Sequence, residues 1–280
     1  MSETAFSSHL DKWLATHPAQ RLAMPYLDEA EHAGHLALAA LEHEWIEAAY
    51  GVREPQVAAV KLNWWAEELA GAPASGGRHP LTRALFSARE SERVTLAHWL
   101  APVQAALGQQ DLPTAADYGQ QLGQAEGLHG ALARLETLWW YGPGSAPARA
   151  ERVAALDHLL YAAAQLDFRA DRERLALPMA RMARHGLDRD GLRNDSSARR
   201  DALRAQLCDI EQGYREAASM PGPLSLFRGL DMRENRRLLC RARRADDPLQ
   251  ALQKGFSRPA AGSVFRAWSA ARAWRRAAQE

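Results

Sequence analysis

The sequence has only two cysteines, Cys208 and Cys240, and their separation matches no metal-binding motif. So few cysteines indicate a reduced compartment. The N-terminal segment lacks a basic region followed by an apolar one, so we expect no secretory signal. No run of 18 apolar residues occurs, so we expect no membrane-spanning helix. These absences predict a soluble, cytoplasmic protein, with contact to the inner membrane face left open as a peripheral location.

Lysine is also scarce, because only Lys12, Lys61 and Lys254 occur and the other basic side chains are arginines. The chain has 35 Lys and Arg against 34 Asp and Glu, for a net charge of +1. A dedicated nucleic-acid binder takes much of its affinity from neutralising phosphates. The charge balance therefore argues against a nucleic-acid partner.

Alternating runs of β-branched residues are absent, whereas Ala, Leu, Arg, Glu and Gln dominate. This composition predicts an all-α protein. The 280 residues, 47% of them hydrophobic, suffice for a large core. The glycine- and proline-rich segment 141–147 could divide the chain, but helices on both sides can bury apolar faces. We therefore predict one bundle-like domain over residues 1–280.

Two helices are predicted at 27–52 and 55–70, on either side of Glu54. Apolar residues recur along the first at helical spacing. The second carries two neighbouring apolar stripes, which predicts burial on several sides. Pro55 suits a first helical turn, and glycine and proline after residue 70 should end the helix. Further helices are predicted at 2–15, 81–88, 91–107, 113–140, 147–167, 179–185, 195–220, 231–244, 248–253 and 260–278.

Three segments resemble the squalene/phytoene synthase family, and in particular its branch related to mitochondrial complex I assembly factors. In residues 54–85, an EP pair precedes a helix with KLNWWAEELAG and then GRHPLTRAL. Residues 118–135 are similar to the family's tyrosine-to-glycine helix. Residues 174–187 are similar to the family's segment around a Leu-Pro pair. The resemblance extends over about residues 36–250.

The resemblance implies an isoprenoid-synthase bundle with a central cavity. Enzymes of this family join two isoprenyl diphosphates head to head. Two DxxxD motifs on facing helices hold Mg²⁺ there, and the i, i+4 spacing puts both carboxylates on one helix face. Aromatic and apolar walls shelter the allylic cation in these enzymes. Tyr118, Trp64 and Trp65 are the candidate substrate contacts here, and packing in the core is the alternative for the two tryptophans.

The first acidic motif should fall within residues 41–50. Aligned without gaps, its aspartates coincide with Ile46, Glu47 and Tyr50, so only Glu47 keeps a carboxylate. Glu44 corresponds to a glutamate of the assembly-factor branch. Glu44 and Glu47 are the candidate metal ligands on this helix, and a solvated helix face is the alternative.

The second acidic motif depends on the alignment. Without gaps its aspartates coincide with Ala164 and Phe168 and are lost. If three residues of the following loop are deleted, Asp167 and Asp171 form the pair. Arg172 and Arg174 then resemble the diphosphate-contacting arginines. The same charged side chains could instead form surface ion pairs.

Two functions follow from these alternatives. The first is a degenerate member that binds an isoprenoid or another apolar-tailed molecule, or serves as an assembly factor for an unknown partner protein, with no cofactor. The second is an active, Mg²⁺-dependent prenyltransferase with a rearranged site. Its catalytic residues would be Asp167, Asp171 and Glu47, its metal ligands these three with Glu44, and its substrate contacts Arg172 and Arg174.

Two further features remain. Glu29 with His32, and Glu126 with His129, form Glu-x-x-His pairs like those of di-iron bundles, although two such pairs can arise by chance in a helical chain. The arginines near residues 232–244 and 270–280 suit either solvated helix faces or docking to anionic lipid.

Overall fold

The computed structural model describes residues 2–171 and 174–278, with side chains for 5–170 and 174–278. Within these ranges it contains helices and no strands, which confirms the predicted all-α class. The helices of the first half are α1 (Ser2–Thr16), α2 (Ala33–Ile46), α3 (Pro55–Ser75), α4 (Pro80–Ser87), α5 (Leu96–Gly108), α6 (Tyr118–Ala125) and α7 (Ala131–Tyr141). Those of the second half are α8 (Ala148–Ala164), α9 (Met179–Arg184), α10 (Arg189–Arg193), α11 (Ser197–Ser219), α12 (Leu226–Arg244), α13 (Pro248–Ser257) and α14 (Ser263–Ala277).

Five short elements complete the description. Three are 3₁₀ helices, namely η1 (Gln20–Tyr26), η3 (Arg89–Arg93) and η5 (Phe168–Asp171). The other two are π-helical turns, η2 (Glu47–Gly51) and η4 (Glu126–Gly130), which continue α2 and lead into α7. A π-helical turn widens a helix and is often found at functional sites.

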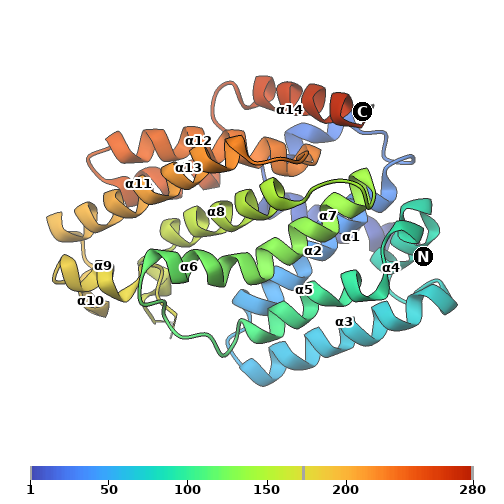
Figure 1. Cartoon of the computed structure of the whole chain (residues 1–280), viewed down its shortest axis with the longest axis horizontal. Coiled ribbons are helices and arrows are strands. Elements are labelled where there is room, and N and C mark those ends of the chain that lie inside the picture. Colours follow the sequence, from blue (N-terminus) through green and yellow to red (C-terminus); the bar gives the residue numbers. More distant parts are fainter. Residues whose placement is uncertain (1, 172–173, 279–280) are drawn as a thin grey trace.

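The bundle has α8 near its middle, with α12, α13 and α14 on one side and α3 and α5 on the other (Figure 1). α8 packs against α7, α11, α12 and α13, while α2 packs against α1, α4 and α7. One large apolar cluster joins α1, α2, α5 and α7, and a second joins α8, α11, α12 and α13. α7 and α8 thus contact each other directly, although segment 141–147 separates them in sequence.

Two sequence expectations about α3 were wrong. The helix does not stop near residue 70 but continues through Pro73 to Ser75, and Gly76 ends it with φ +75°. Only one of its two apolar stripes is buried. Val60 of the other stripe is 70% exposed and Trp64 is 38% exposed. The predicted helix 113–140 also differs, since α6 begins only at Tyr118, where the Asp117 side chain caps it.

Glu68 on α3 holds the start of α4. Its carboxylate accepts hydrogen bonds from the backbone N–H groups of Arg78 (2.6 Å) and His79 (2.8 Å) and from the Thr82 hydroxyl (2.6 Å). Burial alone would raise the pKa of Glu68, but hydrogen bonds from Thr82, His79 and Arg78 outweigh it and lower the pKa to about 2. The GRHP segment that carries much of the family resemblance therefore has a structural role here.

Replacing Glu68 by glutamine is expected to lower the free energy of unfolding by about 2–3 kcal/mol at pH 7, because a charge-assisted network is lost. The folded-state pKa lies below the ordinary value of 4.5, so this stability is present above that value and is lost as the pH falls towards 2. Urea denaturation at pH 7 and pH 3 measures both effects. Glu67→Gln, at the exposed neighbouring position, is the control, and equal stability of the two variants at pH 7 would contradict the assignment.

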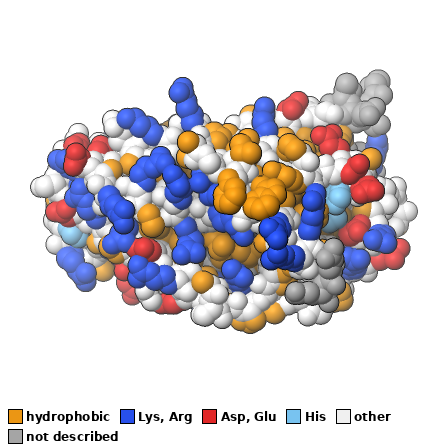
Figure 2. Space-filling model, turned by 90° about the horizontal axis from the view of Figure 1, so that it is seen from above, with side chains coloured by type: hydrophobic (Ala, Val, Ile, Leu, Met, Phe, Trp, Pro, Cys, Tyr) orange, Lys and Arg blue, Asp and Glu red, His pale blue; other side chains and the backbone are white. Residues whose placement is uncertain are grey.

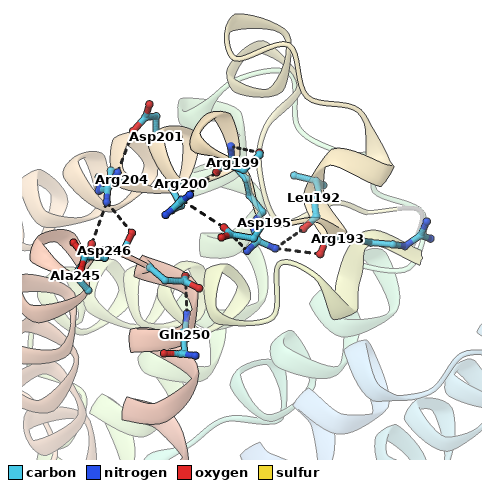
Figure 3. Close-up of polar contacts among 12 residues, drawn as sticks. Leu192, Arg193, Asp195, Arg199, Arg200, Asp201, Arg204, Ala245, Asp246 and Gln250 are labelled. Carbon is cyan, nitrogen blue, oxygen red and sulfur yellow. Dashed lines mark hydrogen bonds and ion pairs between the residues drawn. The ribbon is translucent and has the colours of Figure 1, made fainter.

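Arginines on α11 join it to α10 and to the turn between α12 and α13 (Figure 3). The buried Arg199 donates to the carbonyl oxygens of Leu192 (3.4 Å) and Arg193 (3.2 Å). Arg204 donates to the carbonyl oxygens of Ala245 and Asp246, both at 3.0 Å. These contacts fix the C-terminal end of α12, a helix whose side chains form part of a cavity wall.

Candidate ligand cavity

A cavity of about 270 Å³ lies between α2, α7, α8 and α12. The segment from Thr16 to Gln20 and the loop between α13 and α14 complete its wall. Its interior is unusually rich in polar side chains for the middle of a helical bundle. The titratable side chains that line it are His17, Glu42, His43, Glu47, His129, Glu136, Asp157, His158, Tyr161, Arg228, Asp231, Glu234, Arg237, Arg241 and Arg258.

Arg228 on α12 forms the centre of a buried charge network. Its Nε lies 2.5 Å from Oε2 of Glu136 on α7, and its Nη2 lies 3.5 Å from Oε2 of Glu42 on α2. The Ser225 hydroxyl also donates to Glu136. Burial, and then the neighbouring charge of Glu136, raise the pKa of Glu42 well above its ordinary value. The surroundings of Glu42 therefore favour its protonated form more than water does.

Asp157 on α8 and Asp231 on α12 are two further acidic groups in the wall. Oδ1 of Asp157 accepts from the Tyr214 hydroxyl at 2.5 Å and from Nδ2 of Asn235 at 2.7 Å. Oδ2 of Asp231 accepts from Nε2 of Gln20 at 2.5 Å. Burial raises the pKa of each aspartate to about 7, and for Asp157 the charge of Asp231 adds to this. Both groups therefore change protonation near physiological pH.

The histidines of the cavity are held neutral. The rings of His129 and His158 stack with centroids 4.1 Å apart, and Tyr50 stacks on His158 at 4.7 Å. Burial, followed by the charge of Arg228, lowers the pKa of His129 to about 3. Burial and then His17 lower the pKa of His43 to about 4. A neutral imidazole can donate one hydrogen bond and accept one.

Four buried polar atoms of the wall have no hydrogen-bond partner in the described part of the chain. They are Oε1 of Gln20, Oε1 of Glu42, Nε2 of His43 and Nε2 of His129. Buried polar atoms are usually paired with protein or water, so these four atoms can form hydrogen bonds with water or with a ligand in the cavity. The interior is thus built to make hydrogen bonds as well as apolar contacts.

The mouth of the cavity, defined by its exposed lining residues, is basic. Arg237 and Arg241 lie one turn apart on α12, and Arg258 lies in the loop that follows α13. Within the described ranges, none of these three arginines forms an ion pair, whereas Arg228 deeper inside is paired twice. Glu47, also exposed, is the acidic residue at the mouth. The cavity therefore combines a cationic entrance with an acidic interior.

The structure separates the predicted metal ligands. Glu44 lies outside the cavity wall, where its carboxylate is 2.5 Å from Nζ of Lys12 on α1 and 2.8 Å from Nζ of Lys61 on α3. Burial would raise the pKa of Glu44, but the hydrogen bonds from both lysines lower it to about 2. Glu44 therefore connects three helices. Glu47 does line the cavity.

Asp167 lies beyond the end of α8 and accepts from Nε2 of Gln253 on α13, at 3.2 and 3.3 Å. The Asp171 side chain and the whole of Arg172 lie outside the described residues. Arg174 donates to Oε1 of Gln109, away from the cavity wall.

The three predicted aromatic contacts also lie outside the cavity wall. Trp65 is buried against His79, with centroids 4.7 Å apart, and Trp64 packs on Trp65 at the surface of α3. Tyr118 begins α6, and burial raises its pKa. Their positions indicate packing and give no support to a role in ligand contact. The tyrosines of the cavity region are instead Tyr50 and Tyr161.

The described residues, which do not include the Asp171 side chain, do not fit a magnesium cluster. The positions four residues from Glu47 are His43 and Gly51, so α2 and η2 offer no i, i+4 pair of carboxylates. On α8, the positions four residues from Asp157 are Val153 and Tyr161. Among the described residues, no three His, Cys, Asp or Glu side chains are arranged to hold a metal ion, and this includes the two Glu-x-x-His pairs.

The sequence motifs did not identify the residues that form the interior of the cavity. Arg228, Asp231 and Asn235 recur on α12 at spacings of three and four, which is a charged and polar stripe on a helix with an apolar core face. That stripe was a usable signal, because charged residues at core positions need partners. Glu136 and Asp157 gave a weaker signal, as single acidic residues within apolar stretches of α7 and α8.

Solved structures share this arrangement of helices. A dehydrosqualene synthase in complex with a ligand superimposes with a TM-score of 0.70 and 12% sequence identity, covering 91% of this chain and 96% of the other. The chain has the squalene synthase fold. The squalene synthase HpnC from Alicyclobacillus acidocaldarius gives a TM-score of 0.62 and 13% identity, with 87% and 94% of the two chains covered.

The sequence-based expectation of an isoprenoid-synthase bundle is therefore confirmed at the level of fold. No protein-family model and no curated protein matches the sequence. The narrower likeness to the assembly-factor branch gains no support from these structural neighbours. Within the described ranges, no helix is long and apolar enough to span a bilayer.

Proposed function

We propose that this chain is a degenerate relative of the squalene and phytoene synthases that binds an apolar-tailed molecule without joining isoprenyl diphosphates. One observation carries this proposal. The carboxyl groups of the cavity interior face Arg228, Gln20, Tyr214 and Asn235, so they are already engaged by protein donors. Ionising a diphosphate ester needs strong electrostatic stabilisation of the leaving group, and losing such contacts costs several kcal/mol of barrier.

The wall suggests the chemical class of the ligand. Arg237, Arg241 and Arg258 at the mouth suit an anionic head such as a diphosphate. Leu132, Phe227 and other apolar residues deeper inside suit a hydrocarbon chain. The four unpaired polar atoms of the wall would form hydrogen bonds with a hydroxyl or amide group on the ligand's hydrocarbon chain. A role in assembly with an unknown partner protein, and a cytoplasmic location, both remain proposals that accompany this function.

Incubation with farnesyl or geranylgeranyl diphosphate and Mg²⁺ is expected to give no C30 or C40 product. Calorimetry should instead show binding of farnesyl diphosphate that does not require Mg²⁺. The double variant Arg237→Gln/Arg241→Gln should bind roughly 10–100-fold more weakly, since two charge-assisted contacts are lost. Arg236→Gln, exposed on the same helix but outside the cavity wall, is the matched control. Robust product formation would overturn the proposal.

The alternative is an active, Mg²⁺-dependent head-to-head prenyltransferase with a rearranged site. It is favoured by the position of Glu47 at the mouth and by a fold shared with a dehydrosqualene synthase over 91% of the chain. It requires product formation by the wild type. It also requires that Asp171→Ala or Glu47→Ala abolish turnover while the circular dichroism spectrum and melting temperature stay unchanged. Product formation that survives both substitutions would contradict this assignment of residues.

A further inference from the structure

The C-terminal helix α14 presents large apolar side chains to the outside of the bundle. Val264 is 63% exposed, Phe265 67% and Trp268 43%. The opposite side of α14 is buried against the bundle through Ala267, Ala270 and other small residues. Exposed aromatic residues clustered on one helix are unusual in a protein surface and commonly mark an interaction site.

This apolar cluster continues into a basic one on the same side of the helix. Arg272 follows Trp268 by four residues, and Arg275 and Arg276 lie one further turn along. The Arg272 guanidinium lies 5.6 Å from the centre of the Trp268 ring. Arg275 donates to the carbonyl oxygen of Tyr26 at 3.1 Å. Trp268, Tyr26 and these three arginines surround a shallow hollow beside α14, which offers donors to an anionic group.

Positive charge is concentrated in this part of the chain. Residues 226–278 contain 13 Arg and Lys but only four Asp and Glu, whereas the whole chain has a net charge of +1. Figure 2, which looks onto the side formed by α12, α13 and α14, shows an apolar area bordered by many Lys and Arg side chains. The charge distribution is thus strongly polarised towards one face.

α14 is fixed to the bundle and is not a loosely attached tail. Arg266 forms a two-pronged ion pair with Glu234 on α12, with N–O distances of 2.7 and 3.1 Å. Trp274 packs its ring edge against Trp140, with centroids 5.4 Å apart. The exposed stripe therefore has a defined orientation relative to the cavity. Pro259 at the cavity mouth precedes Val264 by only five residues.

We propose that α14 docks this chain onto an anionic lipid bilayer. Val264, Phe265 and Trp268 enter the boundary between head groups and acyl chains, and Arg272, Arg275 and Arg276 contact lipid phosphates. The charge complementarity selects an anionic bilayer over a protein partner, since an apolar stripe continued by arginines that form no ion pair with the described residues matches the layered chemistry of a lipid surface. Docking in this orientation brings the mouth arginines close to the bilayer. The proposal goes beyond the ligand-binding function and does not depend on it.

Flotation of the full chain with lipid vesicles tests the docking. The protein is expected to float with phosphatidylcholine vesicles in which about a third of the lipid is phosphatidylglycerol, and to remain at the bottom with pure phosphatidylcholine. Raising the salt should release it, because charge attraction is screened. Phe265→Ser/Trp268→Ser should lower the partition coefficient at least tenfold. Arg272→Gln/Arg275→Gln/Arg276→Gln should lower it roughly 100-fold.

The matched control is Arg184→Gln/Arg189→Gln, which removes two exposed arginines of α9 and α10 and is expected to leave flotation unchanged. All variants change exposed residues, and equal melting temperatures confirm that they fold. Failure of the wild type to bind anionic vesicles would overturn the proposal. Equal vesicle binding by the wild type and by the Phe265→Ser/Trp268→Ser variant would also overturn it. So would a variant whose oligomeric state changes while its vesicle binding does not. Calorimetry with farnesyl diphosphate in solution measures ligand binding without vesicles. A failure of membrane docking can therefore be distinguished from a failure of ligand binding.

Discussion

Replacing Arg228 by methionine is expected to lower the free energy of unfolding at pH 8 by about 3–5 kcal/mol, because Glu42 and Glu136 then lose the only cation that contacts both in the described structure. Methionine keeps most of the side-chain length, so the loss reflects charge more than volume. Urea denaturation followed by circular dichroism measures the change. A carboxyl group can become neutral by taking up a proton, so the loss should shrink when the measurement is repeated at pH 5.5.

Two further variants isolate the electrostatic cause. Arg236→Met lies on the exposed side of the same helix and forms no ion pair with the described residues, so its effect should stay within about 0.5 kcal/mol. The double variant Arg228→Met/Glu136→Gln removes one of the two acidic groups that have lost Arg228 and should recover part of the stability. If Arg228→Met were as stable as the wild type at pH 8, the buried network described here would be wrong.

The fold was predictable from sequence because it depends on local patterns. Periodic apolar residues located α8 and α11 within a few positions, whereas the helix predicted at 27–52 begins as α2 only at Ala33 and changes to a π-helical turn after Ile46. Gly142 follows the end of α7 in the segment predicted as a turn. Periodicity shows which residues share a face but not whether another element covers that face. For this reason the second stripe of α3 was predicted as buried, although Val60 and Trp64 are exposed.

The interior of the cavity was much less predictable, because its partners are far apart in sequence. Gln20 and Asp231 are 211 residues apart, and Arg228 and Glu136 are 92 apart. Family motifs directed attention to Glu44 and Asp167. The structure places Glu44 between two lysines and Asp167 on Gln253. Glu42, two residues before Glu44, and Asp157, ten residues before Asp167, line the cavity instead. Only the packing of α2, α7, α8 and α12 identifies them.

The contribution of Asp157 and Asp231 to stability should fall as the pH rises from about 4 to about 8, while the buried histidines, whose pKa values are lowered, act in the opposite sense. Each has a pKa near 7 in the folded protein and an ordinary value of 3.8, so between these values the folded state holds more protons than the unfolded state. The contribution of each aspartate to the free energy of unfolding therefore decreases with rising pH in this window, by up to about 4 kcal/mol for each group. Equilibrium urea denaturation of the wild type and of an Asp157 variant at pH 5 and pH 8 isolates this contribution from that of the histidines.

Asp157→Asn should remove its share of this dependence. The asparagine keeps Oδ1, the atom that accepts from both Tyr214 and Asn235, while it carries no charge. The variant should therefore be more stable than the wild type at pH 8, by a few kcal/mol at most, and nearly equal to it at pH 4. Asp201→Asn, on the exposed side of α11, is the control and should leave the pH profile unchanged. A stability difference between the wild type and Asp157→Asn that stays the same at pH 5 and pH 8 would contradict the raised pKa of Asp157.

The same variant separates stability from ligand binding. A carboxyl group that destabilises the folded protein at neutral pH is typical of a functional site, where stability is given up for an interaction with a ligand. If Asp157 serves the cavity in this way, Asp157→Asn should bind farnesyl diphosphate with altered affinity although it is the more stable protein. Calorimetry at pH 6 and pH 8 should then show a pH-dependent affinity in the wild type that the variant lacks. Equal affinities for both proteins at both pH values would assign Asp157 to the packing of α8 against α11 and α12 alone.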